Sequence, residues 1–226
     1  MAIPETISSK KSLVFPLTIL FEDNYLALIH KPAGILVSGN RFKTIVNALP
    51  QNLKPSSLND ATKPQPVHRL DYATTGLLLV GKTSSSIRAL NQLFENKSIS
   101  KTYLAVTIGE MDDEGKIKLA IDGKPSQSYY KVLESVASKR FSKLNLVELD
   151  PKTGRRHQLR KHLSSIGNPI LGDKDYGITD LILNGKGLYL HAYTLGFVHP
   201  ITNKKMHILD AIPKRFKKLF PALETN

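Results

Sequence analysis

The sequence predicts an α+β protein built on a mainly antiparallel, mixed sheet. Three strand-like segments follow one another after Gly115 without a helix between them, at residues 116–121, 127–135 and 140–149. Consecutive strands of this kind favour antiparallel pairing. An earlier strand at 77–80, an amphipathic helix at 84–96 and a strand at 101–108 add helical cover to the sheet.

The N-terminal part begins with a predicted hairpin. Its strands, residues 17–21 and 25–29, are joined at an Asp-Asn turn. Lys31 stands at the end of the second strand, before a Pro-Ala-Gly bend, where its ammonium could face a cleft or the solvent. Residues 42–49 predict a short helix. Residues 50–65, rich in Pro, Ser and Asn, predict a surface loop.

Another helix is predicted to begin near Arg155. Leu159, Leu163 and Ile166 recur at the helical spacing that places them on one face, toward the core. Gly167 fits the C-terminal cap. Beyond it, the sequence predicts two more strands and a basic amphipathic segment, at residues 188–199, 204–209 and 213–220.

The first turns of this helix carry an unusual charge pattern. They contain four cations, Arg155, Arg156, Arg160 and Lys161. Cations at this end oppose the helix dipole, at a cost of about 0.3–1 kcal/mol each. We therefore expect a compensating anion, either a nucleic-acid phosphate or an internal carboxylate such as Asp71. A solvated basic face is the alternative.

Charge and composition narrow the class of protein. The chain has 226 residues, with 32 Lys and Arg against 19 Asp and Glu, a net charge of +13. Such a field attracts polyanions, nucleic acid above all, although a basic solvated surface would give the same count. The chain has no Cys, which excludes disulfides and thiolate metal sites. Without a secretory signal or a long apolar run, we expect a cytoplasmic protein with no membrane partner.

Asp71 is the leading catalytic candidate. It lies on a polar segment that passes through a Thr-Thr-Gly turn into the apolar strand 77–80, so its side chain should sit at the mouth of a core strand. Arg69, two residues away, favours the ionised carboxylate, which suits nucleophilic attack. The alternative is an Asx turn that accepts backbone N–H groups.

The sequence gives little support to a metal site, a nucleotide-cofactor site or a serine nucleophile. His157 and His162 are five residues apart, so they do not share a helix face as a zinc pair would. Phosphate-binding and dinucleotide-binding glycine patterns are absent from the sequence, as is a serine-nucleophile elbow. We expect no metal site and no cofactor.

Six sequence blocks in order resemble the RluA-type pseudouridine synthases. They are K-P-A-G at 31–34, H-R-L-D followed by T-T-G-L-L-L at 68–79, K-T-Y at 101–103, T-G-R-R-H-Q-L-R-K-H-L at 153–163, G-N-P-I-L-G-D-K-D-Y-G at 167–177 and L-H-A at 190–192. Thr75 stands where Ser is usual, and Arg156 where Thr is common. Neither departure falls on Asp71.

The resemblance implies an architecture and an activity. The sheet would form two halves flanking a central cleft, with helices packed on the outside. Residues 1–16 would be an N-terminal arm and 17–226 a single catalytic domain, without the S4-type RNA-binding domain of some relatives. The protein would convert specific uridines in tRNA or rRNA stem-loops to pseudouridine by flipping the base. No DNA partner and a monomer are expected.

The resemblance also assigns roles to residues. Asp71 would be the nucleophile, Arg160 would pair with it and Tyr103 would stack against the uracil. Leu159 would form part of the pocket floor, and Arg69 would fill the gap left in the RNA. The RNA-binding residues would be Lys31, His68, Arg69, Arg155, Arg156, His157, Leu159 and Lys161.

Three alternatives remain at this point. A non-catalytic RNA-binding protein could use the same scaffold. A glycosidase would need two carboxylates in one cleft, whereas Asp173 and Asp175 lie in a separate turn, where capping or a salt bridge is expected. A basic membrane-surface protein fits least, because the apolar segments alternate like strands.

Overall fold

The computed structural model describes residues 13–183, 185–220 and 223. Its strands are β1 (Thr18–Glu22), β2 (Leu26–Lys31), β3 (Ala61–Pro66), β4 (Thr75–Thr83), β5 (Ser100–Ile108), β6 (Glu114–Lys118), β7 (Gln127–Ser138), β8 (Ser142–Pro151), β9 (Leu190–Val198) and β10 (Lys205–Leu209). Its helices are α1 (Ile45–Asn52), α2 (Ser84–Glu95), α3 (Gln158–Ser165), α4 (Lys214–Lys217) and the 3-10 turn η1 (Thr179–Leu181). Most of the predicted arm, residues 1–16, lies outside the described residues.

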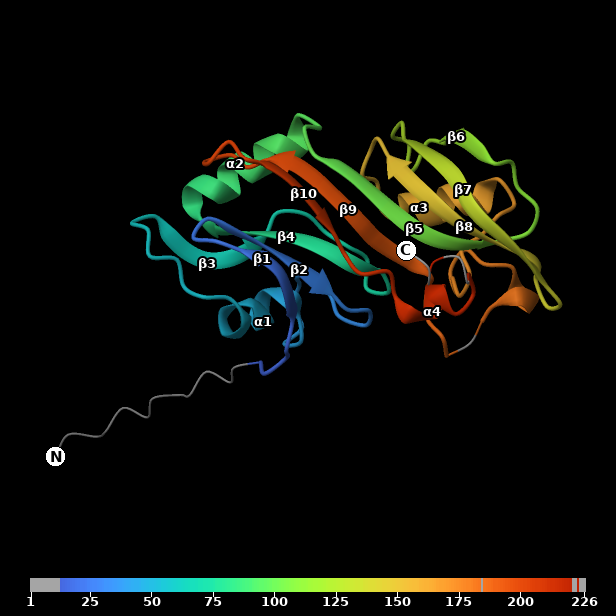
Figure 1. Ribbon diagram of the computed structural model, residues 1–226, viewed down its shortest axis with the longest axis horizontal. Helices are drawn as coiled ribbons and strands as arrows, with labels where there is room; N and C mark the ends of the chain where they lie inside the picture. Colours follow the sequence, from blue (N-terminus) through green and yellow to red (C-terminus); the bar gives the residue numbers. More distant parts are fainter. Residues whose placement is uncertain (1–12, 184, 221–222, 224–226) are drawn as a thin grey trace.

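Within the described residues, the ten strands belong to one sheet, which extends along the length of the molecule (Figure 1). The main path runs β1-β2-β4-β9-β5-β8-β7-β6, with β3 added beside β4 and β10 beside β9. The pairing of β4 with β9 is parallel, and the other strand pairs among these residues are antiparallel. The predicted α+β fold with a mainly antiparallel, mixed sheet is confirmed.

The two halves of the sheet meet where β4 contacts β9. This parallel pairing covers two residue pairs, Thr75 with His191 and Gly76 with Ala192. The Thr75 hydroxyl lies 2.9 Å from His191 Nδ1, so the hydroxyl that Thr shares with the more usual Ser is used at this junction. Beyond it, β4 pairs with β2 and β3, and β9 pairs with β5 and β10. The strands therefore diverge into two halves.

Both faces of the N-terminal half are covered by helices. Leu78 and Val80 of β4 pack in one core cluster with residues of α1. Leu77 and Leu79 point to the opposite face and pack with Leu90 of α2. Because a strand buried on both sides needs apolar residues at every position, the unbroken apolar run 77–80 follows from this arrangement.

The C-terminal half packs β5 and β8 against α3 and α4. Leu163, Phe216 and Phe220 are fully buried in this cluster, and the predicted core position of Leu163 is confirmed. Ile166 is 39% exposed, so its predicted place in the core is wrong. The helix ends at Ser165, which turns the next side chain away from the core. Gly167 has a φ of +82° and provides the predicted cap.

Several boundaries differ from the sequence predictions. Helix α1 begins at Ile45 rather than residue 42, because Thr44 caps it by accepting a hydrogen bond from the Asn47 backbone N–H. It continues past Pro50 to Asn52. The predicted loop 50–65 also contains most of β3, which pairs with β4. This partner lies far along the chain, so local composition did not indicate the strand.

No helix in the described part of the chain is long and apolar enough to cross a membrane.

We predict that Gly76→Ala disrupts the junction between the halves. Gly76 has a φ of +114°, and a Cβ there would lie 2.2 Å from the Ala192 carbonyl oxygen. Backbone strain at this φ and displacement of the Ala192 backbone should together lower the free energy of unfolding by about 2–5 kcal/mol. Gly123→Ala is the matched control, since Gly123 has a φ of +72° but open space around it. Its cost should be only about 1–2 kcal/mol. If urea unfolding shows equal losses of unfolding free energy for Gly76→Ala and Gly123→Ala, the argument from close packing at Gly76 is contradicted.

Candidate active site

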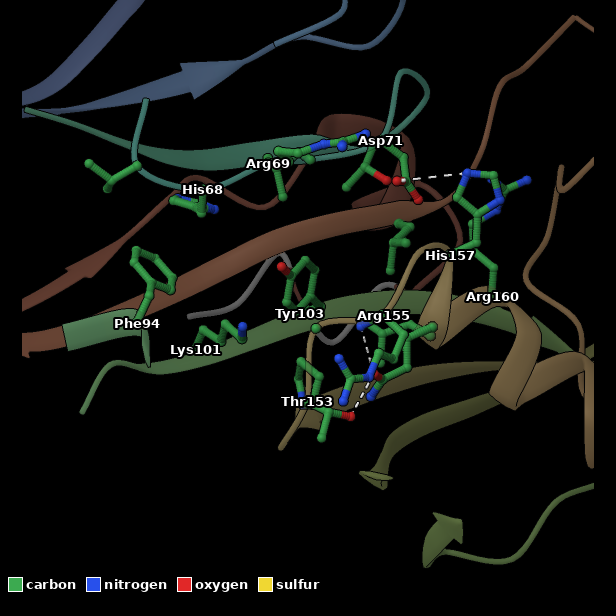
Figure 2. A pocket seen from close by; sticks show the side chains of 18 residues that line it. His68, Arg69, Asp71, Phe94, Lys101, Tyr103, Thr153, Arg155, His157 and Arg160 are labelled. Atoms are coloured by element: carbon green, nitrogen blue, oxygen red, sulfur yellow. Dashed lines mark hydrogen bonds and ion pairs between the residues drawn. The ribbon is translucent and has the colours of Figure 1, made fainter. Parts of the chain in front are cut away.

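A cavity of about 460 Å³ opens beside the junction of the two halves (Figure 2). Its walls come from the segment before β4, from β5 and from the turn between β8 and α3. It is lined by Val67, His68, Arg69, Leu70, Asp71, Thr74, Phe94, Lys101, Tyr103, Pro151, Thr153, Gly154, Arg155, His157, Gln158, Leu159, Arg160 and Leu190. Eight of the eleven candidate residues are among them, whereas Lys31, Arg156 and Lys161 are not.

Asp71 presents a half-buried carboxylate to this cavity. Its side chain is 29% exposed. The turn that contains it is closed by its backbone carbonyl, which accepts a hydrogen bond from the Thr74 N–H at 3.1 Å. Among the described residues no backbone N–H donates to the Asp71 side chain, so the Asx-turn alternative is not supported. The carboxylate oxygens are left to face the cavity.

Lys31 supports the Asp71 turn from beneath. Its side chain is completely buried, and its ammonium donates to the carbonyl oxygens of Thr74 at 2.8 Å, Pro32 at 3.0 Å and Tyr72 at 3.4 Å. Burial lowers the pKa of Lys31 to about 8, while the charge of Asp71 opposes the shift. The prediction that Lys31 contacts RNA is therefore wrong, because its donors are engaged inside the protein. Instead it holds carbonyls within the loop that carries Asp71.

Arg160 forms a buried ion pair that does not include Asp71. Its Nε and Nη2 donate to the two carboxylate oxygens of Asp173 at 2.7 and 2.6 Å, and Nη2 also donates to Asp175 at 2.7 Å. Burial acts to lower the pKa of Arg160, but its hydrogen bonds and the charges of these two carboxylates raise it overall. The predicted pairing of Arg160 with Asp71 is wrong. The internal anions expected for the cationic helix exist, but they lie in the loop after α3.

His157 lies closest to Asp71 among the candidate cations. Its Nε2 is 3.9 Å from Asp71 Oδ1, and its Nδ1 lies 2.9 Å from the Tyr176 hydroxyl. Burial lowers the pKa of His157, and the nearby Arg160 adds to this while Asp71 opposes it. The ring is therefore mostly uncharged near neutral pH. In Figure 2 it faces Asp71 across the cavity.

The backbone of His157 explains why α3 starts later than predicted. Its φ is +55°, a left-handed conformation that interrupts a helix, so α3 begins at Gln158. The Gln158 side-chain oxygen accepts hydrogen bonds from the Thr153 hydroxyl and the Arg155 backbone N–H. Arg155 therefore belongs to a braced turn rather than to the helix.

Tyr103 enters the cavity from β5, on the other side of the junction. It is paired with Ala192 of β9, the residue that also pairs with Gly76. Burial raises the pKa of its phenol, and the negative charge of Asp71 adds to the effect. The hydroxyl therefore stays protonated at neutral pH. Leu159 is buried in the same wall.

His68 is an uncharged part of the cavity wall. Its Nε2 accepts a hydrogen bond from the Leu79 backbone N–H at 3.0 Å, and its ring lies 4.9 Å from that of Phe94. Burial lowers its pKa to about 3, and the charge of Lys101 contributes. His68 therefore lines the cavity as a neutral ring, and its role as an RNA contact stays a prediction.

The remaining predicted RNA contacts differ in whether they lie at the cavity or away from it. Arg69 and Arg155 are exposed and line the cavity, and Arg156 is exposed beside it on the same turn as Arg155. Lys161 lies outside the cavity lining and pairs with Asp122 at 3.2 Å. The exposed arginines are thus the cations best placed for a polyanion.

Phe94 and Lys101 also line the cavity, although neither was a candidate. Lys101 belongs to the K-x-Y block, which was a usable indication. Phe94 lies on the apolar face of α2 and looks like an ordinary core residue in sequence.

Comparisons with known proteins identify the family. Residues 25–165 match the family described as RNA pseudouridylate synthase. The chain belongs to this family. It is therefore an isomerase that acts on RNA, and the non-catalytic alternative is disfavoured.

Individual relatives agree with this assignment. The chain is 34% identical to ribosomal large subunit pseudouridine synthase C of Buchnera aphidicola, over 96% of this chain and 74% of the relative. It is 33% identical to synthase D of Nitrosomonas europaea, over 97% of this chain and 69% of the relative. Among solved structures, human RNA pseudouridylate synthase domain containing 4 superimposes with a TM-score of 0.73 at 26% identity, covering 92% of this chain and 93% of that one.

We predict a pH-dependent stability contribution from Lys31. Its pKa is about 8 in the folded protein and 10.5 without burial, so between these values the unfolded chain binds more protons and stability rises with pH. Lys31→Met removes this pH-dependent contribution to stability. Between pH 8 and pH 10.5, the unfolding free energy of wild type minus that of the variant should increase by roughly 3 kcal/mol. A difference that stays constant in urea titrations across this range would refute the assignment.

We also predict unequal roles for the two partners of Arg160. Asp173 is fully buried, whereas the Asp175 side chain is 61% exposed. Asp173→Asn leaves a buried guanidinium poorly compensated and should cost about 3–5 kcal/mol of stability. Asp175→Asn, the matched control, should cost less than about 1 kcal/mol. Similar decreases in the melting temperature of the two variants would show that the Arg160–Asp173 pair contributes no more to stability than the Arg160–Asp175 pair.

Proposed function

We propose that this protein converts a uridine in structured RNA to pseudouridine, with Asp71 as the carboxylate that starts the reaction. In this isomerisation the bond between N1 and the sugar C1′ breaks, the uracil turns, and C5 bonds to C1′. The proton on C5 is lost and N1 gains one, so no redox partner or energy source is required.

The carboxylate of Asp71 at the cavity mouth is the observation that carries this proposal. It is half-buried, and no described residue donates a hydrogen bond to it. An oxygen with this freedom can reach the sugar or base of a flipped nucleotide. The neighbouring Tyr103 offers a flat ring on which the uracil can stack, an interaction worth about 1–3 kcal/mol. This offsets part of the few kcal/mol that base flipping costs.

Four arginines and Leu159 also have roles in this proposal. Arg69 stands exposed beside Asp71, where it can fill the gap left by the flipped nucleotide. Arg155 and Arg156 hold RNA phosphates. Arg160 acts as a positioning residue, since its guanidinium ties α3 to the loop containing Asp173. Leu159 and the half-buried walls exclude water, so that the detached uracil stays in place.

We propose large-subunit ribosomal RNA as the substrate. The names of the relatives from Buchnera aphidicola and Nitrosomonas europaea support this choice, and tRNA stem-loops are the alternative. We further propose that residues 17–226 act as one monomeric catalytic domain, in the cytoplasm, where both RNAs occur. Mapping pseudouridines by carbodiimide-dependent reverse-transcription stops, in cells with and without the gene, distinguishes the two substrates.

We predict that Asp71→Asn abolishes turnover while RNA binding is retained. The amide keeps the shape of the side chain but cannot act as a nucleophile or base. Release of tritium from RNA labelled at uridine C5 should fall to background, while the dissociation constant changes little. Asp122→Asn, a change at an exposed carboxylate outside the cavity, should leave both unchanged. Near-normal tritium release by Asp71→Asn would disprove the proposed role.

A further inference from the structure

A second cavity of about 660 Å³ adjoins the candidate active site. It lies between the segment joining α2 to β5 and the turn after β8. The two cavities share the wall residues Phe94, Lys101, Pro151, Thr153, Gly154 and Arg155. The two cavities therefore border each other along this shared wall. The volume is in the range of sites that bind small molecules or single nucleotides.

Lys101 stands at the boundary between the cavities. It is half-buried on β5, and its Nζ has no hydrogen-bond or ion-pair partner among the described residues. Burial lowers its pKa, which the charge of Asp150 opposes. A partly desolvated ammonium without a partner is costly unless an anion meets it. By contrast, the buried Lys31 donates to three carbonyl oxygens, and the buried Arg160 pairs with Asp173 and Asp175.

The second cavity is positively charged overall. Its charged residues are Glu95, Lys97, Lys101, Asp150, Lys152 and Arg155. Lys152 and Asp150 pair with each other, which leaves three cations against one carboxylate. This balance suits a phosphodiester.

An aromatic platform stands at the same boundary. The half-buried Phe94 ring lies 4.9 Å from the uncharged ring of His68, with the two ring planes tilted by 33°, and the Lys101 ammonium lies 5.8 Å from the centre of the Phe94 ring. Figure 2 shows Phe94 and Lys101 at the end of the cavity away from His157. A flat ring beside an unpaired cation is the combination that binds a base and its phosphate.

We propose that the second cavity binds the nucleotide next to the target uridine, with Lys101 contacting the phosphate between the two and Phe94 stacking on the neighbouring base. The inference rests on the proposed function and adds a specificity site to it. A strand whose uridine occupies the first cavity must place its neighbour one phosphodiester away, and the shared wall lies there.

The phosphate contact is tested by a double-mutant-type cycle, in which Lys101→Met and a modified RNA linkage are measured separately and together for their effect on binding. The RNA is a stem-loop around the mapped uridine, with a neutral methylphosphonate at the linkage on one side of it or the other. Binding is measured by fluorescence anisotropy in the Asp71→Asn background, which prevents turnover. We expect one of the two modified linkages, and Lys101→Met, each to weaken binding about tenfold. The two losses should not add, because they remove the same contact.

Matched variants control this cycle. Lys101→Arg keeps the charge and should restore both affinity and sensitivity to the modified linkage. Lys118→Met removes an exposed lysine that lines neither cavity, so it should retain full sensitivity to the linkage. If the losses from Lys101→Met and the methylphosphonate add, the phosphate contact is refuted.

The stacking contact is tested in the same way. Phe94→Leu and an abasic neighbour on that side should each weaken binding by about tenfold without adding, and additive losses would refute the platform. Tritium release by the wild-type protein from the unmodified stem-loop distinguishes failure of the proposed second binding site from failure of the proposed function. Activity together with additive losses overturns the subsite alone, whereas absence of activity overturns the proposed function and the subsite with it.

Discussion

The close approach of β4 to β9 at Gly76 and Ala192 is the constraint on which the site depends. Only a glycine fits there, because a Cβ would overlap the neighbouring backbone. Ala192 pairs with Gly76 on one side and with Tyr103 on the other. A single residue of β9 thereby separates the strand that follows Asp71 from the strand that carries Tyr103. The two halves of the sheet diverge from this point, and the cavity opens beside it.

Two largely buried cations bind protein acceptors around this site. Lys31 binds carbonyl oxygens of the turn around Asp71, while Arg160 ties α3 to Asp173. The charge of each is compensated by protein acceptors, as burial of a charge requires. Arg69 and Arg155 are exposed and line the cavity, which leaves their charges open to a polyanion. In the proposed function, Lys31 and Arg160 act as positioning residues and the exposed arginines bind the RNA.

The sequence predicted much of the fold and the identity of the central residues. The run 77–80 predicted a buried strand, the consecutive strands after Gly115 predicted antiparallel sheet, and the motif around Asp71 predicted the carboxylate that lines the cavity. The errors concern which groups touch. Arg160 was expected at Asp71 and lies on Asp173, and Lys31 was expected at the RNA and lies under the loop. Phe94, which resembles a core residue in sequence, lines both cavities.

These differences have one physical origin. Apolar periodicity, turn residues and motif spacing are local properties, so the sequence by itself determined the fold class, most of the strands along the chain and the placing of Asp71 before a core strand. The order of the strands in the sheet, and β3, came only from the structure. The partner of a long charged side chain depends on which carboxylate or carbonyl the chain brings within about 3 Å, and on how much water remains there. Only the tertiary structure decided that Lys31 and Arg160 bind protein acceptors, that burial lowers the pKa of His68 and His157, and that Lys101 has no hydrogen-bond or ion-pair partner among the described residues.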